Sequence, residues 1–372
     1  MSSTLPVFLD CDPGIDDAVA LGYLFCQNDV DIVGIAASGG NVPTAQVVAN
    51  TQGWLELAGR SEIPVHRGHD LPLAWHDGRP PYEDQDAESP EFADLTHGDS
   101  GAGYARLPAP RTAPNPVSAA QAWVDAARAH PGELIGILTG PATNLALALG
   151  LEPELPNLLK RLFIMGGAFN YRGNTHPTTE WNVTFDPDAT ARVLAEFGRA
   201  HEAGTSRHLP VIAPIEATEA VEMTPERLRA ILTHPAGADS LWHEWLRQLA
   251  EALRFYFEFH EWDGLGYIAH IHDPFVLACA LQWARGSQAQ SRESPASAEI
   301  PNGTRGDLPW ATTVWAPVDV ELTGTLTRGE TVADWLGRWG TAVNAEIIRT
   351  IDAHDFLDHL GETLKKGPTP PL

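Results

Sequence analysis

The chain has 372 residues, of which 43% are hydrophobic, and it carries a formal net charge of -25. This length and apolar content are sufficient for a sizeable folded core. Lysine occurs only at Lys160, Lys365 and Lys366, which leaves no basic patch for a nucleic-acid backbone or an anionic membrane. We therefore exclude nucleic acid and lipid as partners and expect a neutral or cationic small molecule.

The cysteines and the N-terminus indicate the compartment. Cys11, Cys26 and Cys279 are odd in number, far apart and set in apolar surroundings, which is typical of reduced core cysteines. The N-terminal residues have no basic segment before a long apolar run, and no run of about 18 uncharged apolar residues occurs. We expect a cytoplasmic protein without a signal peptide or a membrane span.

Apolar runs of strand length alternate with segments of helical period from the N-terminus onward. This alternation predicts parallel strands joined by crossover helices, and so an α/β fold with a mostly parallel central sheet flanked by helices. Ligands of such folds bind at the carboxyl ends of the strands. The predicted strands are 5–10, 30–38, 133–139, 161–167, 312–324 and 344–351, and the predicted helices are 16–25, 44–59, 116–130 and 352–364.

Two polar stretches interrupt this pattern within what we expect to be one domain spanning residues 1–372. Residues 67–115 are rich in Pro, Gly and acids without sustained periodicity, and a connection of this length is usually functional. Residues 285–310 have the composition of a polar surface insertion or a flexible loop. We expect the first stretch to lie near the site.

Four aspartates, Asp10, Asp12, Asp16 and Asp17, follow the first strand within a few positions. Helix capping explains one or two acids at a helix N-terminus. Four crowded carboxylates repel one another unless a cation lies among them. Oxygen ligands in an irregular loop suit Ca²⁺ or Mg²⁺. The pattern favours a cation site, and a capped helix is the alternative.

Polar residues at other strand ends are candidates for the same site. Asp273 precedes a proline and an apolar helix, an arrangement that an ordinary helix start explains on its own. Thr139 ends a predicted strand, so its carbonyl could face the same crevice. The segment 174–182 carries amide and carboxylate side chains of the kind that bind sugar hydroxyls, although an ordinary polar loop would look the same.

Nine motifs follow one another along the chain, from DCDPGIDDAVAL near the N-terminus to VDVELTGTLTRGETV near the C-terminus. Taken together in this order, they resemble the inosine-uridine-preferring nucleoside hydrolases. The resemblance covers nearly the whole chain apart from the two polar stretches, and its first motif is the most specific. It implies a Rossmann-like nucleoside hydrolase fold and a homo-oligomer, a dimer or a tetramer. The matching motifs are DCDPGIDDAVAL, SGGN, HGDSGAG, LTGPATNLA, MGGAFNYRGN, EWN, FDPDA, IHDP and VDVELTGTLTRGETV.

The resemblance implies an N-ribohydrolase that splits ribonucleosides into free base and ribose. One Ca²⁺ per subunit would be held by Asp12, Asp17, the carbonyl of Thr139 and Asp273. Asp12 would also be the general base that activates a metal-bound water. Asp10 would be a buried acid that supports the metal loop. Carboxylates around the sugar suit this chemistry, because the ribosyl group becomes cationic as the bond breaks.

The remaining site residues divide between the sugar and the base. His272 would protonate the leaving base, which in the family accompanies broad inosine/uridine-type specificity, and His97 would lie on the base side. Trp181 stands where the family usually has Phe. By resemblance the ribose would be bound by Asp16, Asn174, Glu180 and Asn182, with Asn41 near the water and the sugar.

Two other functions compete with this one. A haloacid-dehalogenase-type phosphatase also opens with Asp-x-Asp after its first strand, but the residue two positions later would be Thr or Val, and here it is Gly14. An inactive Ca²⁺-dependent nucleoside-binding protein would carry the same residues, and binding without ribose release would distinguish it.

Overall fold

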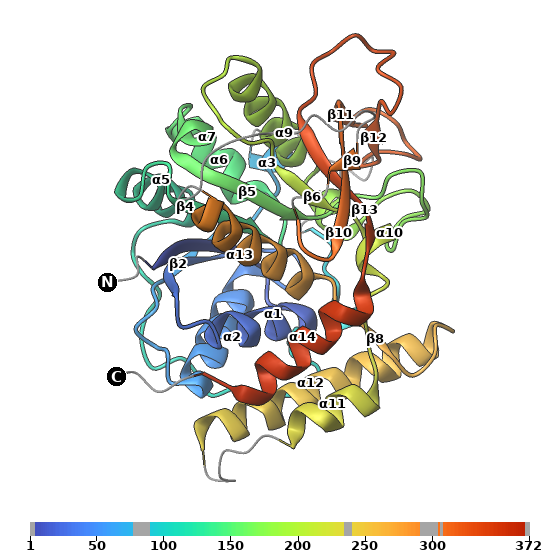
Figure 1. Cartoon of the computed structure of the whole chain (residues 1–372). Coiled ribbons are helices and arrows are strands. Elements are labelled where there is room, and N and C mark those ends of the chain that lie inside the picture. The colour runs from blue at the N-terminus through green and yellow to red at the C-terminus, as the bar shows by residue number, and fades with distance from the viewer. Residues whose placement is uncertain (1–3, 77–89, 234–239, 291–303, 306–307, 369–372) are drawn as a thin grey trace.

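The computed structural model describes residues 4–76, 90–233, 240–290, 304–305 and 308–368. In this described part, nine strands form one sheet that runs through the middle of the molecule (Figure 1). In sheet order they are β3 (Val65–Arg67), β2 (Val30–Ala37), β1 (Leu5–Cys11), β4 (Leu134–Leu138), β5 (Leu159–Met165), β6 (Val211–Ala213), β13 (Ala345–Ile351), β10 (Ala311–Ala316) and β9 (Thr304–Arg305).

The strands from β3 to β13 all pair in parallel, whereas β10 pairs antiparallel with β13 and β9. The predicted mostly parallel α/β fold is therefore confirmed, with an antiparallel edge. Two small antiparallel ribbons lie outside the main sheet. They pair β11 (Val318–Val320) with β12 (Thr331–Ala333) and β7 (Glu222–Met223) with β8 (Ala269–His270).

Helices cover both faces of the sheet (Figure 1). In chain order they are α1 (Ile15–Phe25), α2 (Thr44–Ala58), α3 (Leu73–His76), α4 (Asp94–His97), α5 (Ala119–Ala129), α6 (Thr143–Leu151), α7 (Leu155–Leu158), α8 (Trp181–Phe185), α9 (Pro187–Glu202), α10 (Ile215–Thr218), α11 (Pro225–Leu232), α12 (Leu241–Trp262), α13 (Asp273–Gln290) and α14 (Ala353–Lys366). One face carries α5, α6 and α9, and the other carries α1, α2 and α13, with α11, α12 and α14 packed outside α1.

Strand β1 shows why the sheet has a core on each face. Successive side chains of a strand point to opposite faces, so Val7 and Leu9 pack into the core beneath α1 and α13. Phe8 points the other way, where its ring lies 4.6 Å from that of Trp123 on α5. Asp10 lies on the Phe8 face and meets α5 and α6. Asp10 therefore faces α5 and α6 and does not line the cavity described below.

The two polar stretches have more structure than their composition predicts. The stretch 67–115 contains α3 and α4, and its residues 77–89 lie outside the described residues. Helix α13 continues past Arg285 to Gln290, because the Arg285 guanidinium pairs with Asp29 at 2.6 Å and holds the helix end. The predicted insertion therefore begins too early, and most of the rest of it lies outside the described residues.

Helix α12, the longest helix of the described chain, was not among the predicted elements. Its apolar positions recur at helical spacing and are buried, beginning with Trp242, Trp245 and Leu249. Trp245 packs against Gly22 of α1, where even a Cβ would lie 2.2 Å from the indole ring. No helix in the described ranges is both long and apolar enough to cross a membrane.

Candidate functional site

A cavity of about 460 Å³ opens where the carboxyl ends of the central strands meet the loops that follow them. Its volume falls within the range of small-molecule sites. Of the predicted residues, Asp10 and Asp17 do not line it but are buried next to those that do. Those that line it are Asp12, Asp16, Asn41, His97, Thr139, Asn174, Glu180, Asn182, His272 and Asp273.

Asp10 is completely buried and accepts hydrogen bonds from neighbouring elements on the α5 face. Ser38 Oγ donates to its Oδ1 at 2.6 Å, and Asn144 Nδ2 donates to the same oxygen at 3.1 Å. Trp123 Nε1 donates to Oδ2 at 2.7 Å. Burial raises the pKa of Asp10 to about 6, and these donors oppose that rise. The carboxylate therefore joins β1, β2, α5 and α6 directly behind the acidic loop.

Asp12 presents one carboxylate oxygen without a partner. Its Oδ2 accepts a hydrogen bond from the backbone N of Asn41 at 2.7 Å, and Asn41 Nδ2 donates to the Asp12 carbonyl at 3.0 Å. Its Oδ1 is buried and has no hydrogen-bond partner among the described residues. A Cβ at Gly40 would lie only 2.1 Å from Oδ2, so the SGGN turn needs glycine there. A buried acceptor of this kind is costly unless something binds it.

Three further carboxylates crowd together beside Asp12. Ligand oxygens of Asp16, Asp17 and Asp273 lie within 4.8 Å of one another, and all three residues are buried. Burial raises the pKa of Asp16 to about 6, and burial together with the Asp16 charge raises that of Asp17 to about 7. Burial and the same neighbours raise the pKa of Asp273 well above its usual value. A bound cation would remove this repulsion.

The ligand atoms available in and around this cluster suit a hard cation. They are carboxylate and carbonyl oxygens without a His or Cys ligand, which is the set that Ca²⁺ or Mg²⁺ prefers. Thr139 Oγ1 donates to Asp17 Oδ1 at 2.9 Å and fixes that carboxylate. The structure groups Asp16 with the acids predicted to hold metal, although the sequence analysis assigns Asp16 to the sugar. The division of Asp12 and Asp16 between metal and ribose stays a prediction.

Of the residues predicted to bind ribose, Asp16 lies on α1, whereas the other three come from the loop after β5 and from α8. Glu180 begins α8, and its carboxylate accepts hydrogen bonds from the backbone N of Asn182 at 2.8 Å, Gly167 at 3.0 Å and Val183 at 3.1 Å. Burial nevertheless raises the pKa of Glu180 to about 7. Asn182 Nδ2 donates to the carbonyl of Thr139 at 2.8 Å. These bonds fix the carboxylate of Glu180 and the amide of Asn182 in the cavity lining.

The two histidines predicted on the base side have different surroundings. His272 Nδ1 lies 2.8 Å from Thr218 Oγ1, and burial lowers the pKa of His272 well below its usual value. Thr218 thereby orients the ring and leaves Nε2 for a ligand. His97 Nδ1 accepts a hydrogen bond from the backbone N of Ile15 at 3.1 Å. His97 therefore also holds α4 against the N-terminus of α1.

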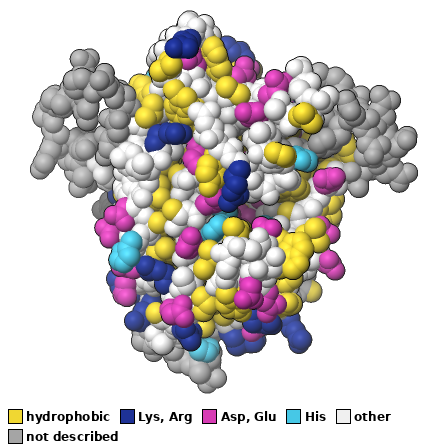
Figure 2. Space-filling model, turned by 90° about the vertical axis from the view of Figure 1, so that its right-hand side faces the viewer, with side chains coloured by type: hydrophobic (Ala, Val, Ile, Leu, Met, Phe, Trp, Pro, Cys, Tyr) yellow, Lys and Arg dark blue, Asp and Glu magenta, His cyan; other side chains and the backbone are white. Residues whose placement is uncertain are grey.

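Negative charge dominates the cavity lining. Among the described lining residues, Arg172 is the one Lys or Arg side chain, whereas acids occur on every side. On the outer face shown in Figure 2, basic side chains lie among acidic ones rather than in one continuous patch. The acids that line the cavity are Asp12, Asp16, Glu91, Glu180, Glu219, Asp263 and Asp273. This lining favours a neutral ligand that develops positive charge.

Several residues around the cavity were missed by the sequence analysis. Trp123 and Ser38 reach Asp10 from separate elements, and Thr218 and Glu219 follow β6 in a segment whose glutamates stand singly among mostly apolar residues. Their side-chain types are ordinary for a helix or a loop, so residue type gave no signal. The position of Thr218 and Glu219 after a parallel strand was the available signal.

Comparison with known proteins agrees with this geometry. The family model described as inosine-uridine preferring nucleoside hydrolase matches residues 7–358. The chain belongs to the inosine-uridine-preferring nucleoside hydrolase family. It is accordingly an N-ribohydrolase, an enzyme that hydrolyses the N-glycosidic bond of ribonucleosides. The phosphatase alternative loses its support.

Nucleoside hydrolases resemble the chain over almost its whole length. It is 32% identical to the pyrimidine-specific ribonucleoside hydrolase RihA of Salmonella arizonae over 366 residues, covering 97% of this chain and 98% of that protein. Among solved structures, the plant nucleoside hydrolase PpNRh1 superposes with a TM-score of 0.77 at 24% identity, covering 97% and 98% of the two chains. A purine-preferring ribonucleoside hydrolase from Gardnerella vaginalis gives 0.76 at 23%, with the same coverage. The two solved structures support the nucleoside hydrolase fold.

Proposed function

We propose that this nucleoside hydrolase uses one calcium ion per subunit and Asp12 as its general base. The observation that carries the proposal is the Asp12 Oδ1 atom, which has no hydrogen-bond partner in the described part of the chain and lies near the buried group of Asp16, Asp17 and Asp273. Asp12, Asp17, Asp273 and the carbonyl of Thr139 would hold the cation. When bound, the cation would make a water molecule more acidic and hold hydroxyl groups of the sugar.

The side chains of the enzyme would have separate roles in breaking the N-glycosidic bond. Asp12 would accept the proton of the attacking water through Oδ1. Asp16, Asn41, Asn174, Glu180 and Asn182 would hold the ribose. The carboxylates of Asp16 and Glu180 would favour the positive charge that the sugar ring develops as the base departs.

We also propose a broad inosine/uridine-type specificity. The curated relative cited above is named pyrimidine-specific and one similar structure is named purine-preferring, so the base preference needs a direct test. A reducing-sugar assay with uridine, cytidine, inosine, adenosine and guanosine is expected to give activity with both uridine and inosine in calcium. EDTA is expected to abolish it, and added calcium to restore it. Activity unaffected by EDTA would contradict the cation requirement.

A second prediction concerns His272. The Thr218 hydroxyl lies 2.8 Å from His272 Nδ1 and also 3.3 Å from the Pro214 carbonyl oxygen, which competes for its single proton. When that proton points to Nδ1, the ring proton of His272 lies on Nε2, where it can reach the leaving base. We expect His272→Ala to lower kcat for inosine by about a hundredfold. p-Nitrophenyl riboside is the control substrate, because its leaving group departs without a proton. The role would be wrong if inosine turnover stayed within a few fold of wild type.

The homo-oligomeric state stays a prediction, which sedimentation equilibrium would test.

A further inference from the structure

The loop between β5 and α8 carries Asn174 on an exposed turn over the cavity. Within the turn, the backbone N of Gly173 donates to the Pro177 carbonyl at 3.0 Å, and that of Asn174 donates to Thr179 at 3.2 Å. A Cβ at Gly173 would lie 1.9 Å from the His176 carbonyl oxygen. The turn is therefore tight, but these contacts are internal to it. Its position over the cavity depends on contacts with other elements.

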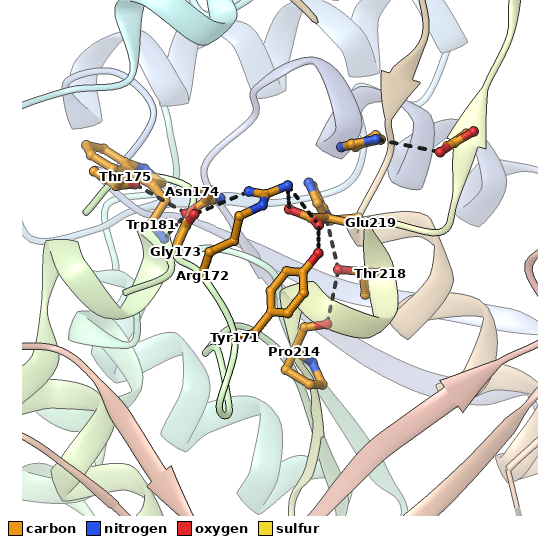
Figure 3. Close-up of polar contacts among 12 residues, drawn as sticks. Tyr171, Arg172, Gly173, Asn174, Thr175, Trp181, Pro214, Thr218 and Glu219 are labelled. Atoms are coloured by element: carbon orange, nitrogen blue, oxygen red, sulfur yellow. Dashed lines mark hydrogen bonds and ion pairs between the residues drawn. The ribbon is translucent and has the colours of Figure 1, made fainter. Parts of the chain in front are cut away.

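One such contact is made by two consecutive side chains on Glu219. Tyr171 OH donates to Glu219 Oε2 at 2.8 Å, and Arg172 Nη2 lies 3.1 Å from Oε2 and 3.0 Å from Oε1. Arg172 Nη1 also donates to the Gly173 carbonyl at 3.3 Å. Figure 3 shows the Tyr171 and Arg172 side chains converging on the Glu219 carboxylate. The guanidinium thus links Glu219 to the residue before Asn174.

Glu219 occupies a well-fixed position. It directly follows α10, and its backbone N donates to the carbonyl of Ile215 at 2.9 Å. The backbone N of Ile215 donates in turn to the Gly167 carbonyl at the start of the loop, at 3.0 Å. Glu219 lines the cavity, and the Glu219 side chain is 12% exposed. The preceding residue, Thr218, holds His272.

We propose that Glu219 is a positioning residue that holds the Asn174 turn over the sugar side of the cavity through Tyr171 and Arg172. The proposal rests on the proposed function for its kinetic consequence, because Asn174 is assigned there to the ribose. Thr218 and Glu219 then fix the base side and the sugar side of the site from adjacent positions. Loss of the Glu219 charge would loosen the turn and weaken ribose binding, while the reacting groups keep their places.

The test uses Glu219→Gln, whose amide keeps the shape but sets an NH₂ group against two donors. Amide hydrogen exchange in the segment 168–181 is expected to become about fivefold faster, as for the loss of one partly exposed charge-assisted contact. KM for uridine or inosine should rise about fivefold, with kcat within twofold of wild type. Tyr171→Phe should give a smaller change in the same direction. The double variant should be no worse than Glu219→Gln alone.

Glu258→Gln is the matched control, because Glu258 accepts hydrogen bonds from Tyr104 OH at 2.6 Å and Arg254 Nη1 at 3.1 Å and is not among the residues that line the cavity. It should leave exchange in 168–181 and KM unchanged. Unchanged exchange in both Glu219→Gln and Tyr171→Phe would overturn the proposal, as would an equal rise in Glu258→Gln. The exchange measurement needs no substrate. A wild-type enzyme that cleaves no nucleoside would overturn the proposed function and leave this test intact.

Discussion

Replacing Asp12 by asparagine is expected to lower kcat for uridine or inosine hydrolysis by about a thousandfold or more. The amide oxygen can still accept the hydrogen bond of the Asn41 backbone N, so the SGGN turn should keep its shape. The NH₂ group then replaces Oδ1, the buried oxygen without a partner among the described residues. That position can no longer accept a proton or bind a cation. A reducing-sugar assay under saturating nucleoside and calcium measures the loss.

Two further aspartates provide controls for this variant. Asp125→Asn on the exposed side of α5 should leave kcat unchanged. Asp10→Asn should lower activity by roughly ten- to a hundredfold, because Asp10 only supports the loop that carries Asp12. Its amide would also face donors from Ser38, Asn144 and Trp123. If Asp12→Asn kept a tenth of wild-type kcat, Asp12 would not be the general base.

The metal-free enzyme is expected to lose stability as the pH rises from about 7 to about 8. Burial raises the pKa of both Asp17 and Glu180 to about 7, and that of Asp273 well above its usual value. The folded state therefore holds protons in this range that the unfolded chain, with ordinary carboxyl pKa values near 4, has already released. Stability falls with pH wherever the folded state binds more protons. Each proton that is bound only in the folded state lowers the free energy of unfolding by about 1.4 kcal/mol for every pH unit of increase.

Buried histidines set the lower limit of this window. Burial lowers the pKa of His97 to about 3 and that of His270 to about 4. Their folded pKa values lie below the unfolded value of 6.5, so these groups add stability as the pH rises through lower values and oppose the aspartates there. The unfolded histidines lose their remaining protons between pH 6.5 and about 7.5, so this opposing effect fades over that range and the carboxylate effect dominates toward pH 8.

Calorimetric Tm values at pH 6.5, 7.25 and 8, with EDTA and with calcium, would check this prediction. Calcium should raise Tm most at pH 8, because a cation favours the ionised carboxylates. Asp273→Asn should stabilise the metal-free protein at pH 8 and reduce the calcium response. Identical Tm values with and without calcium at every pH would contradict a cation site among these acids.

Much of the fold was predictable because periodicity depends on local sequence. The runs that became β1, β2, β4 and β5 lie within a few residues of their predicted positions, as do the helices α1, α2, α5 and α14. The long helix α12 was missed, and the predicted insertion began inside α13. A helix end depends on partners distant in sequence, as Asp29 shows for Arg285. Local pattern cannot supply such partners.

The candidate site, like the fold, was predictable only where its residues lie close together in the sequence. The crowding of Asp12, Asp16 and Asp17 is visible in the sequence, because the carboxylates stand within a few positions and their repulsion calls for a cation. The contacts of Asp186 are not visible there. This residue accepts hydrogen bonds from Leu73 N at 2.7 Å and Thr143 Oγ1 at 2.6 Å, and so fixes the start of the 67–115 stretch.

The sequence by itself determined the α/β class, the family resemblance and the crowded acids that predict a cation site, since these follow from residue type and short spacing. Only the tertiary structure decided which oxygen of Asp12 has no hydrogen-bond partner among the described residues, that Thr218 contacts the His272 ring, and that Glu219 accepts hydrogen bonds from Tyr171 and Arg172. These relations join residues on separate strands and helices. They arise when the parallel sheet gathers the carboxyl ends of its strands at one edge.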